Sequence, residues 1–189
     1  MSGFFSQIRS QRLFKQPPSY KGDCDEIVRY LQEGGVECLY HFTDRSNLES
    51  IRKYGLLSYE TCAKMGITIP RPGGNELSRK LDIQHHLLDF VRLSFSTDHP
   101  MMGRLKRQGY DLVLLKVDLR VAGFLQAFYS DRNATENSFE MGSDLSFLKR
   151  LNECAQTDMY KQIQAEVLVR SFIPADFVLN LESPIQVLF

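Results

Sequence analysis

The chain has 189 residues and a mass of 21.8 kDa, which suits a single domain. Its composition is 43% hydrophobic and 24% charged, which excludes a disordered, fibrous or collagen-like chain. Lys+Arg and Asp+Glu are equal at 23 each, so a nucleic-acid partner would have to be held by a local basic patch. Four separate cysteines form no C-x-x-C pair, which favours free thiols and predicts no metal site. No apolar run reaches 18 residues, so we expect a cytoplasmic protein that makes no membrane contact.

The first 22 residues are expected to form a basic arm ahead of one domain over residues 23–189. This segment has no acidic residue, contains a Pro17-Pro18 break, and carries the cations Arg9, Arg12, Lys15 and Lys21. The arm is a candidate for anion binding, and the alternative is a solvated tail.

In chain order, the domain is expected to alternate helices and strands early and to crowd strands late. Apolar periodicity and Gly or Pro breaks predict helices over 23–32, 44–54, 76–88, 102–107 and 145–154. Strands are predicted over 36–42, 90–96, 112–117, 163–169 and 177–181, and residues 58–76 are expected to form a long loop. This order favours an α+β domain over a doubly wound sheet, and no G-x-G-x-x-G or P-loop motif is present.

Three polar clusters interrupt apolar strands. The first is Tyr40-His41-Phe42-Thr43 with Asn47, the second is Ser94-Phe95-Ser96-Thr97, and the third is Gln164-Ala165-Glu166. Each has a structural explanation when taken alone: a core histidine beside a helix cap, a solvated strand face, and an edge strand. Glu166 is the most informative, because a carboxylate is seldom placed in an apolar strand without a partner or a chemical role.

Taken together, the clusters resemble the ADP-ribosyltransferase superfamily, and within it the DarT group of toxins that modify DNA bases. The likeness spans about residues 38–180 and rests on matching stretches at 39–43 with 47–48, 51–57, 88–91 with Phe95, 100–101, and 164–169 with Pro174. It implies an ADP-ribosyltransferase-like fold, with a split mixed β-sheet core and flanking helices.

The resemblance also implies roles for individual residues. His41, Thr43, Asn47 and Tyr40 would bind NAD, and Glu166 would be catalytic. Arg79 is the choice for the catalytic arginine, with Arg71 and Arg92 also near. The acceptor would be oriented by Gln164, Ser96 and Thr97. The chain departs from the family pattern at Arg92-Leu93-Ser94 and at Asp98, which stands in place of a basic residue and leaves the choice of base open.

The resemblance implies an NAD-dependent enzyme that attaches ADP-ribose to a nucleobase of single-stranded DNA, as a toxin or anti-phage effector. A flipped or single-stranded base is required because pairing hides the attacking nitrogen. A cationic groove for the strand would include Arg71, Arg104, Lys106 and Arg107 together with the arm. A neutralising antitoxin is also implied, either a macrodomain hydrolase or a protein that blocks the site.

Two alternatives stay open. One is an ADP-ribosyltransferase acting on RNA or on a protein side chain, since Gln164-x-Glu166 also resembles the pair in transferases that modify protein arginine. The other is a catalytically silent nucleic-acid-binding domain.

Overall fold

The computed structural model describes residues 18–73, 76–134, 136, 138–155 and 164–187. The α-helices in this part of the chain are α2 (Cys24–Glu33), α3 (Leu48–Tyr54), α4 (Tyr59–Met65), α5 (Glu76–Gln84), α6 (Pro100–Arg107) and α7 (Leu145–Ala155). Its strands are β1 (Leu39–Asp44), β2 (Leu56–Leu57), β3 (Phe90–Ser94), β4 (Leu112–Val117), β5 (Ala127–Ser130), β6 (Met141–Gly142), β7 (Glu166–Arg170), β8 (Phe172–Ile173) and β9 (Ile185–Gln186). Short 3-10 turns are η1 (Arg45–Asn47), η2 (Leu119–Gly123) and η3 (Ala175–Phe177).

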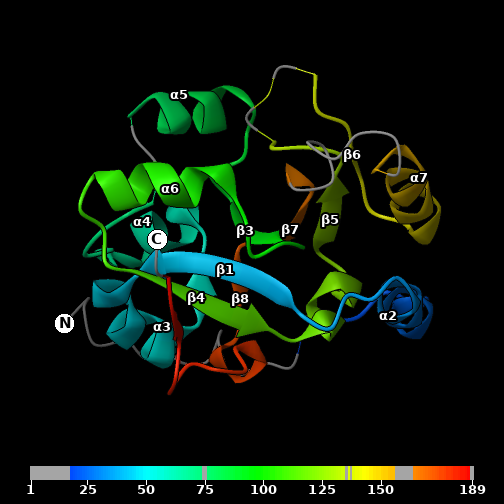
Figure 1. Cartoon of the computed structure of the whole chain (residues 1–189), viewed down its shortest axis with the longest axis horizontal. Coiled ribbons are helices and arrows are strands. Elements are labelled where there is room, and N and C mark those ends of the chain that lie inside the picture. Colours follow the sequence, from blue (N-terminus) through cyan, green and yellow to red (C-terminus); the bar gives the residue numbers. More distant parts are fainter. Residues whose placement is uncertain (1–17, 74–75, 135, 137, 156–163, 188–189) are drawn as a thin grey trace.

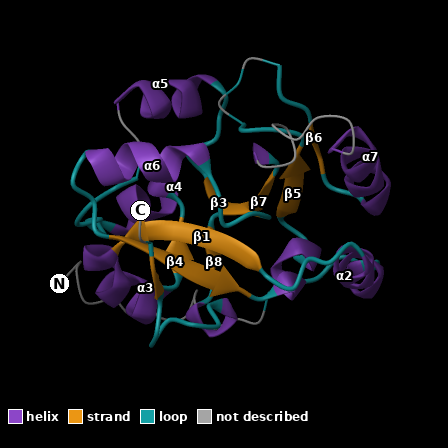
Figure 2. Ribbon diagram, viewed as in Figure 1, coloured by secondary structure: helices purple, strands orange, loops and turns teal. Residues whose placement is uncertain are grey.

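Seven strands form one sheet in the order β6-β5-β7-β3-β1-β4-β9, and β2 pairs with β8 in a small ribbon. The expected α+β class is confirmed, and the helices flank the sheet (Figures 1 and 2). The expectation of a mixed sheet was wrong for the described strands. Each of their pairings is antiparallel, because no described helix returns the chain to a parallel neighbour.

Two apolar cores hold helices on opposite faces of the sheet. The larger core packs α2 and α3 against inward-facing residues of the sheet, among them Leu39, Leu93, Val113 and Val117. On the other face, Met102 and Leu105 of α6 pack against Leu112 and Leu114. Figure 1 shows α5 and α6 together on one side of β1 and α3 on the other.

The sheet opens between β1 and β3, as the split core predicted. These strands share only the register pair Tyr40↔Ser94, whereas β1 pairs with β4 from Leu39↔Val117 to Asp44↔Leu112. Beyond Tyr40, β1 therefore diverges from β3 and leaves space that side chains of both strands line.

Local features explain where the helices begin and end. Ser58 caps α4 by accepting a hydrogen bond from the Thr61 N–H, and Gly66 follows the helix in the left-handed conformation. His99 caps α6, and Pro100 occupies the first helical position.

Two sequence expectations are corrected. Residues 58–76 do not form one long loop, because the Ser58 cap and the Gly66 stop enclose α4. Residues 177–181 are not a strand: Phe177 ends η3, and Val178 makes only an isolated bridge with Val117. The other predicted helices and strands are present with shifted ends, and the strand over 112–117 has the predicted bounds.

The predicted arm lies mostly outside the described residues, but its last part packs on the sheet. The Lys21 ammonium donates to the Ala127 carbonyl at 2.7 Å and to the Tyr129 hydroxyl at 3.1 Å. Tyr20 forms an isolated antiparallel β-bridge with Phe124. Lys21 therefore joins the segment to the domain and does not extend a free cationic surface. In the described part of the chain, no helix has the length and apolarity needed to span a membrane.

Candidate active site

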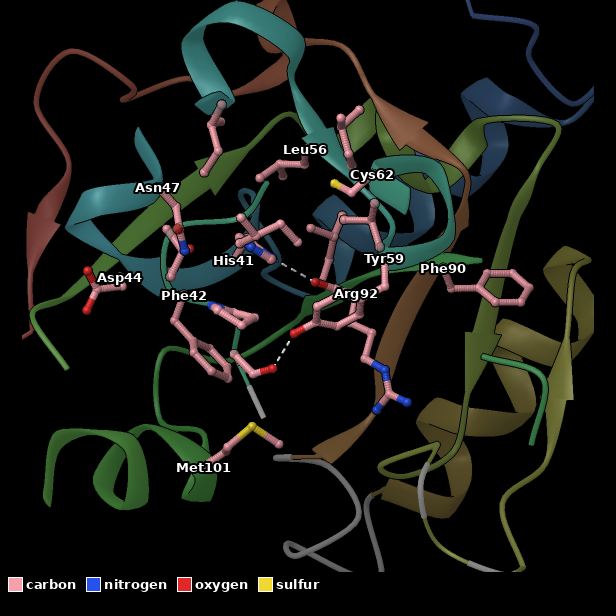
Figure 3. A pocket seen from close by; sticks show the side chains of 18 of the residues that line it. His41, Phe42, Asp44, Asn47, Leu56, Tyr59, Cys62, Phe90, Arg92 and Met101 are labelled. Carbon is pink, nitrogen blue, oxygen red and sulfur yellow. Dashed lines mark hydrogen bonds between the residues drawn. The ribbon is translucent and has the colours of Figure 1, made fainter. Parts of the chain in front are cut away.

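A pocket occupies the opening between β1 and β3 (Figure 3). The His41 Nδ1 lies 3.0 Å from the Arg92 carbonyl oxygen, so a side chain bridges the two strands where their backbones diverge. Burial lowers the pKa of His41, which favours a neutral imidazole. The pocket is lined by β1, by the residues that follow it, and by β3, α5 and β7; among them are His41, Thr43, Asn47, Tyr59, Asp82, Arg92, His99 and Glu166.

The residues predicted to bind NAD from the first strand do meet at this pocket. Asn47 is buried, and its Nδ2 donates to the Thr43 Oγ1 at 3.0 Å and to the Arg71 carbonyl at 2.7 Å. Its Oδ1 accepts from the Arg71 N–H at 3.0 Å. Asn47 therefore connects the backbone of Arg71 to Thr43 of β1 and stabilises this wall of the pocket. Tyr40 also lines the pocket and packs with the core beneath α6.

Glu166 starts β7 opposite Ser94 of β3, and the residue is buried. Its Oε2 accepts from the Ala134 N–H at 3.0 Å and lies 3.5 Å from the Arg92 Nη1. Burial raises the pKa of Glu166, opposed by the Arg92 charge and by the Ala134 hydrogen bond. A buried carboxylate facing one guanidinium in a pocket is typical of catalytic sites.

The arginine that contacts this carboxylate is Arg92. Arg79, predicted to be catalytic, lies on the exposed surface of α5 with its guanidinium 5.6 Å from the centre of the Tyr59 ring. No described contact joins Arg79 to Glu166, and its catalytic role stays a prediction. Arg92 was named from the sequence only as a nearby alternative, and its place in the apolar strand Phe90-Val91-Arg92-Leu93, where a charge needs a partner, is the signal that favours it. Figure 3 shows its guanidinium extending away from His41.

The residues predicted to orient the acceptor are not among the described residues that line the pocket. Thr97 is exposed, and the Ser96 hydroxyl accepts from the Asp98 N–H at 3.0 Å in the turn after β3. Gln164 precedes β7, so strand alternation does not place it beside Glu166 as expected, because the strand begins at Glu166 itself. The Gln164 side chain is buried, and its Nε2 has no hydrogen-bond partner in the described structure.

His99 is a pocket residue that the sequence did not single out. Its Nδ1 accepts from the Met101 N–H at 3.2 Å, which leaves the proton of a neutral ring on Nε2. Within the described structure this Nε2 is buried without a partner. Burial and the nearby Arg92 charge lower the pKa of His99 to about 4, so the ring stays neutral at pH 7.

These features fit NAD. The pocket offers apolar walls from Ile51, Leu56 and Leu93, and it offers polar groups from His41, Thr43 and Ser94. The unpaired His99 Nε2–H is a buried donor at the same pocket, suited to an acceptor on a ligand. Among the described residues, no group of His, Cys, Asp and Glu could hold a metal ion.

Of the cations predicted to line a groove for the strand, Arg71 and Lys106 make contacts within the described structure. Arg71 stacks on Tyr110, 4.1 Å from the ring centre, and lies 3.7 Å from the Asp44 carboxylate. Lys106 donates to the Val187 carbonyl. Arg104 and Arg107 are exposed on α6 and remain available to a polyanion.

Comparison with known proteins agrees with this geometry. A family model described as "ssDNA thymidine ADP-ribosyltransferase, DarT" matches residues 40–182. No curated protein matches. Among solved structures, Thermosipho africanus DarTG in complex with ADP-ribose is similar with a TM-score of 0.62 and 19% identity, over 75% of this chain and 42% of that chain.

Structures of DarT from Thermus sp. 2.9 are also similar. DarT in complex with ADP-ribosylated ssDNA has a TM-score of 0.61 and 18% identity, over 76% of this chain and 79% of that one. DarT in complex with carba-NAD+ has a TM-score of 0.52 and 23% identity, over 76% and 80%. At these identities the structures show the shared fold, while the family match covers well over half of the chain. The chain therefore belongs to the DarT family, NAD-dependent ADP-ribosyltransferases that act on thymidine in single-stranded DNA.

Proposed function

We propose that the pocket between β1 and β3 binds NAD and that Glu166 is the catalytic residue for transfer of ADP-ribose to a thymine base of single-stranded DNA. One observation carries this proposal: a buried carboxylate, held by the Ala134 N–H and facing Arg92, lies in the pocket where the sheet opens. His41, Thr43 and Asn47 form the wall that would hold NAD, as the family resemblance implied.

The chemistry explains why a buried carboxylate is needed. The bond between nicotinamide and ribose breaks with its electron pair leaving on nicotinamide, and a ring nitrogen of the base bonds to the ribose carbon in its place. Positive charge develops on the ribose, and a fixed carboxylate away from water stabilises it strongly. The base nitrogen must also lose its proton, and the raised pKa of Glu166 makes this carboxylate a suitable acceptor.

Arg92 supports this site in a different way. Its guanidinium offers donors in a fixed planar fork, which suits contacts to carboxylate, phosphate or carbonyl oxygens. It lies beside Glu166, whereas Arg79 lies at the exposed surface of α5. We therefore propose Arg92 as the arginine of the catalytic centre and Arg79 as a residue at its rim.

The expected partners follow from this chemistry. Arg104 and Arg107 on the exposed surface of α6 would contact the phosphates of the strand. Because modification of the host's own DNA would harm the host, we propose a cytoplasmic toxin with an antitoxin, either a macrodomain hydrolase that removes ADP-ribose or a protein that blocks the pocket.

The test is transfer of label from NAD to single-stranded DNA, RNA or a protein extract, using wild type, Glu166→Gln and the surface control Glu182→Gln. Label should appear on single-stranded DNA, fall at least about a hundredfold in Glu166→Gln, and persist in Glu182→Gln. The mass of the modified nucleoside names the base. The wild type should also arrest bacterial growth, and Glu166→Gln should not.

Two results would change the proposal. If label appears on RNA or protein alone, the proposed NAD site and the role of Glu166 stand, but the acceptor is not single-stranded DNA. Full activity in Glu166→Gln, in protein that unfolds at the same denaturant concentration as wild type, would remove Glu166 from the mechanism.

A further inference from the structure

A second buried carboxylate, Asp82 of α5, lines the same pocket and competes with Glu166 for Arg92. The Arg92 Nη2 lies 2.5 Å from the Asp82 Oδ1, while its Nη1 lies 3.5 Å from the Glu166 Oε2 and donates to the Asn133 Oδ1 at 3.2 Å. The exposed fractions of the side chains are 12% for Asp82, 22% for Arg92 and 7% for Glu166. Charged side chains of α5, β3 and β7 thus meet at one guanidinium.

The charges in this cluster do not balance. When both carboxylates are ionised they share one guanidinium, and the cluster then has a formal net charge of −1 in a mostly buried site. The shorter contact assigns the Arg92 charge mainly to Asp82. Glu166 keeps one backbone N–H donor and a longer contact with the guanidinium. Its carboxylate is therefore the less compensated of the two.

The charged groups near Asp82 and near Glu166 also show that both carboxylates depend on Arg92. Burial raises the pKa of Asp82; Arg92 opposes this shift, Glu166 adds to it, and His85 opposes it. Glu166 faces Arg92 from β3, Asp82 from α5 and the Ala134 N–H from the segment after β5, and Ser94 is its register partner. Arg92 is thus the cation that both carboxylates face.

We propose that Asp82 is a positioning residue of the active site: it holds the Arg92 guanidinium and leaves Glu166 as the carboxylate free to face the reacting ribose. The inference rests on the proposed catalytic role of Glu166. A tight Arg92–Glu166 pair would neutralise the charge that stabilises the developing cation, and Asp82 prevents that pairing. Because Asp82 belongs to α5 and contacts Arg92 of β3, the position of this helix relative to β3 also affects the charge at Glu166.

The test is the pH dependence of kcat/KM for Asp82→Asn. Without the Asp82 charge, the guanidinium turns to Glu166 and favours its ionised form, so the acid limb of the profile should move about one pH unit lower. Activity on the plateau should fall about tenfold or more, because a paired carboxylate stabilises positive charge less well. Asp82→Glu keeps the charge, and its acid limb should stay at the wild-type position.

Asp89→Asn is the matched control. Asp89 lies just before β3 and pairs with Arg170 of β7 at 3.3 Å, outside the pocket, so its loss should move neither the acid limb nor the plateau. An unmoved acid limb in Asp82→Asn, or an equal shift in Asp82→Glu, would overturn the role of Asp82 while the proposed function stands. Activity that survives in Glu166→Gln would overturn the proposed function itself, and the role of Asp82 with it.

Discussion

His99 caps helix α6 and also lines the pocket. Its Nδ1 satisfies the Met101 N–H at the start of α6, where backbone donors lack helical partners. His99→Ser and His99→Ala both remove the ring, but Ser keeps an oxygen that can cap the helix. We expect the Ser variant to be more stable than the Ala variant by about 1 kcal/mol in urea unfolding.

The two His99 variants also separate capping from ligand binding. Both lack the Nε2–H donor, which is buried and unpaired at the pocket in the described structure. Their NAD affinities should therefore fall together, although their stabilities differ. Equal unfolding midpoints would mean that the Met101 N–H does not need the cap.

At the residue scale, the sequence located the carboxylate better than its arginine. Glu166 stood out because it interrupts an apolar strand, and that signal is local. Which arginine meets it depends on the register of β3 against β7, which sets Ser94 opposite Glu166 and brings Arg92 to the same face. Arg79 precedes β3 and Arg92 lies within it, so the sequence offers both as candidates. The pairing of β3 with β7 places Arg92 beside Glu166.

At the element scale, Gly55 fixes the junction between α3 and the β2–β8 ribbon. Its φ is +80°, and a Cβ there would overlap the Ile173 carbonyl oxygen. Gly66, with φ +64°, ends α4 with nothing within 4 Å of such a Cβ. Gly66→Ala should cost about 1 kcal/mol from the left-handed backbone alone. Gly55→Ala should cost about 3 kcal/mol or more, because its φ of 80° and ψ of −169° suit glycine alone and because the ribbon must also move.

Chemical denaturation of both variants checks this prediction, since Gly55 combines a backbone conformation that suits glycine alone with the overlap, and Gly66 has only the left-handed backbone. Similar losses would show that the backbone at residue 55 and the ribbon both adjust freely. A displaced β2–β8 ribbon also bears on the pocket, because Gly55, Leu56 and Leu57 line its wall. Gly55→Ala should therefore weaken NAD binding, and Gly66→Ala should leave it unchanged.

The elements that the sequence predicted well are those with strong local signals. The run Leu112–Val117 is buried along almost its whole length as β4, and apolar composition alone identified it. The strand β5 (Ala127–Ser130) was missed because its mixed residues carry no clear period; its pairing with β7 is a long-range contact. The same reasoning explains why Phe177–Leu181 looked like a strand: its apolar residues pack in the core as a 3-10 turn and a single bridge.

At the scale of the whole molecule, Lys21 ties the segment before α2 to the central sheet. Its ammonium binds the Ala127 carbonyl and the Tyr129 hydroxyl, and it lies 4.5 Å from the centre of the Tyr129 ring. Burial lowers the pKa of Lys21 to about 8, although Asp23 and Asp144 oppose the shift. The molecule therefore holds a cation whose charged form is less favoured in the folded state than in the unfolded state.

This difference gives a pH dependence with a definite sign. Between about pH 8 and the unfolded value near 10.5, the unfolded chain binds more protons at Lys21 than the folded chain, so the free energy of unfolding rises with pH. Burial raises the pKa of Tyr129, which opposes the trend only above its ordinary value of 10.0. Lys21→Met removes the titration, and the exposed Lys80→Met does not. From about pH 7 to about pH 9.5, the wild type and Lys80→Met should therefore gain stability relative to Lys21→Met in urea unfolding. Parallel stability curves for all three proteins would show that the Lys21 ammonium is as well solvated in the folded molecule as in the unfolded chain.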